Sequence, residues 1–159
     1  MFKKFPIIKE VKDMAKEWSD FIGNKHSIKS DGRNLEAGNY AEVIFWRMYP
    51  SARRISDIDR QADFVLSGKR IDVKAKDRMG PATGQYEASI EDRQRDYNCD
   101  FYAFFSYNRP ALIMEFCGWI SKKEYFKKAI KVLRGTVDRN NSWKCSVDCW
   151  NLHYRFLHR

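Results

Sequence analysis

The segment 62–76, ADFVLSGKRIDVKAK, constrains the fold most, because it is typical of two strands joined by a tight turn. Alternate side chains of a strand point to the same face. In the second strand the apolar side chains therefore share one face: Ile71, Val73 and Ala75. Asp72 and Lys74 share the other, so one face is typical of a core and the other presents a carboxylate beside an ammonium group.

Two registers are open for this hairpin. If Ser67-Gly68 is the two-residue turn, Leu66 pairs with Lys69 and Asp63 lies opposite Asp72. If Gly68-Lys69 is the turn, Asp63 faces Lys74. Both registers keep Asp63, Asp72 and Lys74 on one face, whereas a three-residue loop would place Asp63 on the opposite face.

Directly opposed strand positions have Cβ atoms ~5 Å apart. Two carboxylates at that spacing repel each other unless a cation lies between them, and oxygen ligands in a partly hydrated site suit Mg²⁺ or Mn²⁺. The alternative is a surface ion pair between Asp72 and Lys74, worth a few tenths of a kcal/mol. Glu42, in the helical run YAEVIFW, offers a third acid if its helix packs across the hairpin. Its alternative is the exposed side of that helix.

The order of elements predicts an α/β fold, a mixed β-sheet with flanking helices. The apolar spacing and turn residues predict helices at 7–22, 34–49, 88–98 and 121–134, and strands at 53–56, 62–68, 69–76, 100–108, 111–120 and within 142–159. We interpret 1–159 as a single domain. Its core covers about 34–107, and a strand-helix-strand extension follows at 108–159.

With these residues and this order, the chain resembles the PD-(D/E)XK nuclease superfamily, whose core runs α-β-β-β-α-β in a restriction-endonuclease-like fold. The resemblance implies that Glu42, Asp63 and Asp72 bind the metal and that Lys74 completes the catalytic set. It also gives Gln94, in EDRQRD, an assisting role on the following helix. The proline that often precedes the second-strand acid is replaced by Ala62. The implied activity is a Mg²⁺- or Mn²⁺-dependent deoxyribonuclease, acting as endonuclease or exonuclease in phage or prokaryotic DNA processing.

The composition favours a polyanionic partner. The net charge is +9 and the pI is near 9.4, as in proteins that bind nucleic acid or acidic membranes. No apolar run approaches the ~20 residues of a membrane span, so we expect an intracellular, cytoplasmic protein with no membrane partner. The predicted DNA contacts are the basic residues near the site and a lysine stripe on the helix at 121–134: Arg53, Arg54, Lys69, Arg70, Lys76, Lys123, Lys127 and Lys131. An ordinary solvated helix face explains the lysine stripe equally well.

The four cysteines are Cys99, Cys117, Cys145 and Cys149. Disulfides are not expected in a reducing cytosol. Cys145 and Cys149 are four residues apart, and His153 follows Cys149 at the same spacing. This is the nearest approach to a metal-ligand pattern, but zinc sites usually show two close pairs. We expect ordinary thiols rather than zinc or an iron–sulfur cluster.

Three functions compete with a deoxyribonuclease. A non-catalytic DNA-binding module on the same fold would have no need to keep three acids together, so the acidic set argues against it. An RNA-directed nuclease and an interaction protein with an acidic partner both remain open, as does the choice between a monomer and a homodimer.

Overall fold

The structure is a computed structural model that describes residues 1–22, 33–56, 58–137 and 145–159. Its central element is a mixed six-stranded sheet. Its strands lie in the order β1 (Lys3–Pro6), β7 (Ile113–Ser121), β6 (Phe101–Asn108), β4 (Lys69–Arg78), β3 (Phe64–Leu66) and β2 (Arg53–Arg54). Only β4 and β6 run parallel, and the other neighbours are antiparallel.

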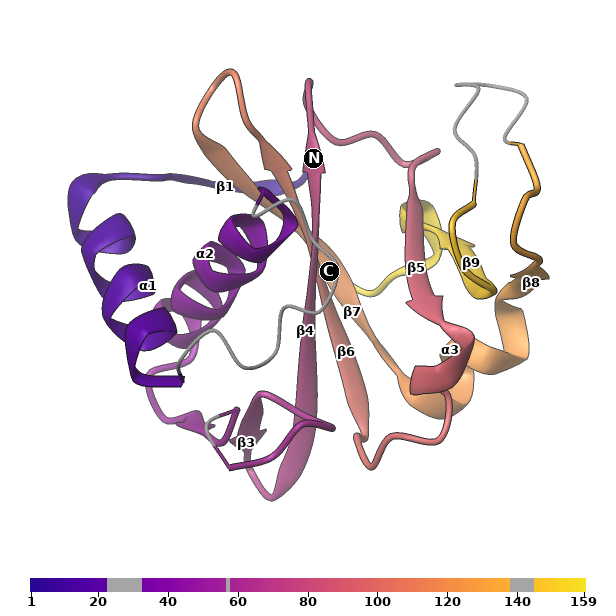
Figure 1. The fold of residues 1–159 in the computed structure, drawn as a ribbon, viewed down its shortest axis with the longest axis horizontal. Coiled ribbons are helices and arrows are strands. Elements are labelled where there is room, and N and C mark those ends of the chain that lie inside the picture. The colour runs from indigo at the N-terminus through magenta and orange to yellow at the C-terminus, as the bar shows by residue number, and fades with distance from the viewer. Residues whose placement is uncertain (23–32, 57, 138–144) are drawn as a thin grey trace.

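Two helices cover one face of this sheet, α1 (Lys9–Ile22) and α2 (Arg33–Met48) (Figure 1). The apolar stripe of α1 packs on α2, and both bury side chains against the apolar face of β4 and β6. The fully buried residues of this layer include Val11, Ala41, Val43 and Phe105. Ile71 and Val73 join them, so the predicted apolar face of the hairpin lies in the core.

A second, three-stranded sheet faces the other side of β4 and β6 (Figure 1). It consists of β5 (Glu87–Glu91), β9 (Cys149–His153) and β8 (Ile130–Val132), with β9 in the middle. Helix α3 (Lys122–Lys128) lies beside it, with the short turns η2 (Asp92–Gln94) and η3 (Tyr154–Phe156). The buried Tyr125 ties the layer together, because its hydroxyl donates to the carbonyls of Ala88, at 3.0 Å, and Trp150, at 2.5 Å.

The mixed α/β class, the first two helices and most predicted strands are confirmed, although β1 was not anticipated. The helix predicted at 88–98 is wrong. That segment forms β5 and η2, because Ala88 and Ile90 alternate with polar residues and are buried against β9. The second core helix implied by the resemblance is therefore absent from this described segment, and the restriction-endonuclease-like order is not reproduced there.

The helix predicted at 121–134 is too long. Ser121 caps α3 as expected, since its hydroxyl accepts from the N–H of Glu124 at 3.2 Å. The helix ends at Lys128, Ala129 is extended with ψ 148°, and 130–132 forms β8. Lys131 thus pairs with Trp150 in a sheet. The predicted stripe of Lys123, Lys127 and Lys131 therefore does not lie on one helix.

Candidate active site

The hairpin of β3 and β4 takes the first of the two registers. Leu66 pairs with Lys69, Val65 with Arg70 and Phe64 with Ile71. Ser67 and Gly68 have φ angles of 50° and 74°, as the two central residues of a type I′ turn require. Glycine adopts this geometry at no steric cost, so the turn sequence sets the register and the faces of all that follows.

Asp63 lies where the two strands separate. The ladder ends at Phe64, although the N–H of Asp63 still donates to the carbonyl of Ile71 at 2.9 Å. The Asp63 side chain then takes the place of a ladder acceptor, and its Oδ2 receives the N–H of Val73 at 2.7 Å. The carboxylate is thereby fixed against the backbone of β4, beside the strand position that carries Asp72.

Asp72 and Lys74 form an ion pair with 2.9 Å between Oδ2 and Nζ. The side chain of Asp72 is 6% exposed and that of Lys74 24%, so the pair is not a solvated surface bridge. The contact has the distance but not the angles of a hydrogen bond, and Oδ2 of Asp72 has no hydrogen-bond donor within the described ranges. The Lys74 ammonium compensates the charge of this buried oxygen but leaves it without a well-aligned hydrogen-bond donor.

Glu42 reaches the same region from α2. Its Oε2 lies 3.4 Å from Nε of Arg54 and 3.2 Å from Oγ of Ser56. Arg54 is the last residue of β2, and Ser56 follows that strand. The guanidinium of Arg54 stacks on the ring of Trp18, 4.3 Å from its centroid. The Glu42 side chain is 17% exposed. It is thus a buried acid of the site rather than the exposed side of a helix.

The acids influence one another electrostatically. Burial raises the pKa of Asp63 well above its ordinary value, and the charges of Glu42 and Asp72 raise it further. Burial also raises the pKa of Glu42, against the opposing effects of Arg54 and Ser56. Burial alone would lower the pKa of Lys74, but the charges of Asp72 and Asp63 outweigh it and raise that pKa. The four side chains therefore form one electrostatic cluster.

The donor set fits a hard cation through two carboxylates. Within the parts of the chain that the structure describes, no three His, Cys, Asp or Glu groups converge closely enough to hold a metal ion. Mg²⁺ commonly binds one or two carboxylates and keeps several waters, so it does not need such a cage. Asp63 and Asp72 supply two carboxylates, and Oδ2 of Asp72 is ion-paired with Lys74 at 2.9 Å. Glu42 is engaged by Arg54 and Ser56.

Gln94 is the predicted site residue that the structure places least favourably. It ends the short turn η2 rather than lying on a helix, and its carbonyl accepts from Tyr97. No hydrogen bond within the described ranges joins its side chain to the four charged residues. Its assisting role stays a prediction.

The predicted basic contacts lie in different surroundings. Arg53 and Lys69 are exposed near the hairpin, and Arg70 pairs with Asp59. Lys76 is half-buried, and its Nζ donates to Oγ of Ser89 at 2.6 Å. Burial and nearby Arg78 lower its pKa to about 8. The remaining predicted contacts are Lys123 and Lys127, exposed on α3, and Lys131, which pairs with Asp92 at 2.9 Å.

Sequence reasoning missed Ser56, Cys99 and Tyr102. Tyr102 is the ladder partner of Asp72 across β4 and β6 and is completely buried. Cys99 is close enough to Asp72 and Lys74 for their charges to shift its pKa, although burial is the main cause of the upward shift. Of these three, only Ser56 could have been found from the sequence. It lies two residues after Arg54, so in an extended chain the two side chains point to the same face.

The buried thiols of Cys145 and Cys149 lie 3.3 Å apart, with Cys149 at the start of β9, and all four cysteines are free. Nδ1 of His153 is 2.7 Å from the carbonyl of Gln85.

Among the described residues, no helix has both the length and the apolar character needed to cross a membrane. Comparison with protein-family models and with curated proteins yields no match for this chain.

Proposed function

We propose that this protein is a metal-dependent deoxyribonuclease. The observation that carries the proposal is the buried cluster at the point where β3 leaves β4. There Asp63, directly before β3, lies beside Asp72 and Lys74 of β4, and Glu42 approaches from α2. Gathering like charges away from water destabilises the fold. Glu42 pairs with Arg54, and Asp72 pairs with Lys74. Asp63 is therefore the additional acid of the site, and a divalent cation would neutralise it.

Each side chain has a role that follows from its position. Asp63 and Asp72 would hold a Mg²⁺ or Mn²⁺ ion. Such an ion, when bound, polarises a scissile phosphate and lowers the pKa of water. Lys74, kept protonated by the acids around it, is placed to orient the attacking water or to compensate charge on the transition state. Arg54 neutralises Glu42 and holds it in place.

The net charge of +9 favours a nucleic-acid partner, and Arg53 and Lys69 expose cations beside the hairpin. Contacts of this kind bind phosphates without reading the sequence. One observation favours a second candidate, the non-catalytic DNA-binding module. Glu42 is already paired with Arg54, so the cluster holds fewer free acids than the motif suggests. The setting that we propose remains phage or prokaryotic DNA processing.

Cleavage assays separate the two candidates. The pure protein is incubated with linear, circular and four-way-junction DNA in Mg²⁺ or in EDTA, and metal binding is followed by titration calorimetry. A nuclease cuts at least one of these substrates in Mg²⁺ and none in EDTA. A binding module retains the DNA and leaves all three intact in both buffers.

Two variants then separate the roles within the cluster. Asp72→Asn should lose metal affinity and cleavage while retaining DNA binding, because a ligand charge is removed but the shape is kept. Lys74→Ala should retain metal binding and lose about 10²-fold or more in single-turnover rate. Asp77→Asn is the matched control, since Asp77 lies on the same strand but pairs with Arg109. Near-parental cleavage by Asp72→Asn would refute the metal-site assignment.

A further inference from the structure

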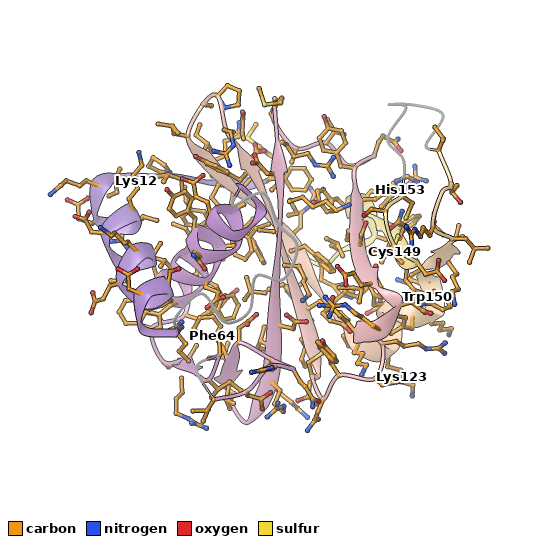
Figure 2. All side chains as sticks on the ribbon, in the orientation of Figure 1. Lys12, Phe64, Lys123, Cys149, Trp150 and His153 are labelled. Atoms are coloured by element: carbon orange, nitrogen blue, oxygen red, sulfur yellow. The ribbon has the colours of Figure 1, made fainter. Side chains whose placement is uncertain are left out.

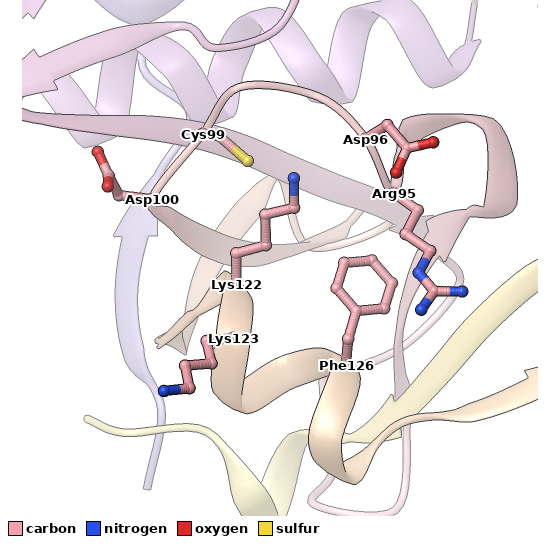
Figure 3. A pocket seen from close by; sticks show the side chains of 7 residues that line it. All are labelled: Arg95, Asp96, Cys99, Asp100, Lys122, Lys123 and Phe126. Atoms are coloured by element: carbon pink, nitrogen blue, oxygen red, sulfur yellow. The ribbon is translucent and has the colours of Figure 1, made fainter.

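An open hollow lies beside the candidate site, where α3 begins and where the chain enters β6 (Figure 3). Its volume is about 510 Å³, within the range of small-ligand sites. The residues that matter here are Arg95, Cys99, Lys122, Lys123 and Phe126. Figure 2 shows Lys123 and Trp150 on the flank of the molecule opposite α1.

The hollow contains an aromatic ring with a cation beside it. In Figure 3 the ring of Phe126 lies between the side chains of Lys122 and Arg95. The Arg95 guanidinium is 5.8 Å from the Phe126 centroid and 5.1 Å from that of Trp150, and the two rings meet edge to face at 5.6 Å. Trp150 thus supports Phe126 from one side. An aromatic ring beside an arginine is a surface on which nucleic-acid bases stack.

The charges of the hollow favour a phosphate at its rim. Three of its lining side chains are cationic, against the two acids Asp96 and Asp100. Asp100 is partly satisfied, since its Oδ2 accepts the N–H of Arg70 at 2.8 Å. Lys122 is turned inward and donates to the carbonyl of Tyr97. Arg95 and Lys123 are exposed, which leaves them able to contact a phosphate.

One completely buried side chain, Tyr102, neighbours both Phe126 of the hollow and Asp72 of the charged pair. Phe126 packs edge to face on Tyr102 at 6.3 Å, and Tyr102 is the ladder partner of Asp72. Neighbouring strands lie ~4.8 Å apart. Cys99 lines the hollow and also feels the charges of Asp72 and Lys74. Cys99 and Tyr102 are therefore neighbours of both the hollow and the charged pair.

We infer that the hollow holds one unpaired nucleotide of the DNA strand that is cut. This inference rests on the proposed function and specifies its substrate class, DNA with a single-stranded end or branch. Within a duplex both faces of a base are already stacked, so only an unpaired base can offer a face to Phe126. Arg95 and Lys123 contact the adjoining phosphates.

The test is fluorescence anisotropy in EDTA, with a labelled 12-nucleotide single strand and the matching duplex. Phe126→Leu keeps the apolar packing but removes the ring face. It should weaken single-strand binding about 10-fold and leave duplex binding unchanged. Arg95→Ala and Lys123→Ala should weaken single-strand binding and reduce its salt dependence. Lys128→Ala, on the same helix but outside the hollow and paired with Glu124 at 2.7 Å, should bind as the parent does.

Parental single-strand affinity in Phe126→Leu would overturn the inference, and so would an equal loss for single strand and duplex. Tighter binding of the RNA single strand of the same sequence would overturn the assignment to DNA. Binding in EDTA is independent of cleavage, so the two proposals fail separately. If no DNA is ever cut but Phe126→Leu loses single-strand affinity, the nuclease proposal fails and the hollow remains a binding site.

Discussion

Replacing Asp63 by asparagine should stabilise the metal-free protein while abolishing its activity. Asparagine has almost the same shape, and its side-chain oxygen can still accept the N–H of Val73. What disappears is a negative charge that burial disfavours and that Glu42 and Asp72 repel. The pKa of Asp63 is raised in the folded state, so its contribution to stability is complete below its unfolded pKa and is lost as the pH rises through the folded one.

The magnitude follows from the spacing of the hairpin. Two like charges at ~5 Å repel by ~3 kcal/mol at an effective dielectric constant of about 20. Lys74 attracts Asp63 and cancels part of this repulsion, which leaves a gain of about 1–2 kcal/mol for the variant at pH 8. For a chain of this length that gain raises the melting temperature by roughly 2–8 °C.

The assay is urea unfolding of parent and Asp63→Asn between pH 4 and pH 8 in EDTA, repeated with Mg²⁺. The stability advantage of the variant should grow with pH and shrink when Mg²⁺ is added, because the ion stabilises only a protein that binds it. Asp63→Ala is the control, since it also removes the acceptor of the Val73 N–H and should cost about 1–3 kcal/mol relative to Asp63→Asn. A variant less stable than the parent at pH 8 in EDTA would refute the proposed repulsion.

Three further outcomes are expected. Gly118→Ala should destabilise the fold by about 2 kcal/mol or more in urea unfolding, because Gly118 has φ +134° and a Cβ there would lie 2.3 Å from the carbonyl oxygen of His158; parental stability would contradict this. Burial lowers the pKa of Lys76 to about 8, so the Lys76→Met variant should gain most stability over the parent below pH 8. That gain should fade as the pH rises toward the unfolded pKa of ~10.4. A gain independent of pH would exclude Lys76 as its source. DNA affinity should fall steeply between 50 mM and 200 mM salt in a binding titration, and a flat response would remove the electrostatic basis of binding.

The hairpin could be predicted because its determinants are local. The period-two alternation of β4 and its turn residues limit the hairpin to two registers without reference to the rest of the chain, and the structure takes the one in which Ser67 and Gly68 form the turn. The strand β5 was missed because its partner β9 is distant in sequence. Ala88 and Ile90 already alternate with polar residues, but the charges that follow them favoured a helix. Likewise, Ile130 and Val132 join a sheet through β9 rather than continue α3.

The site was predictable only in part. Alternation placed Asp72 and Lys74 together, and the order of elements brought Glu42 near them. Sequence patterns contain no information on Arg54 and Ser56 as partners of Glu42, because these contacts depend on how α2 crosses β2. The hollow beside Phe126 could not be anticipated either, since it forms where two segments that are distant in sequence, 95–100 and 122–126, meet.

The central position of β9 has a consequence for biosynthesis. Both β5 and β8 pair with β9, and all of β9 is translated after them. While the chain emerges from the ribosome, β2, β3, β4, β6 and β7 can already assemble under α1 and α2, but β5 must wait with its backbone unpaired. Trp150, which supports Phe126, arrives on the same late strand. A nascent chain would therefore complete its charged cluster before Trp150 reaches Phe126, and the recognition of unpaired strands that we infer for the hollow would mature last.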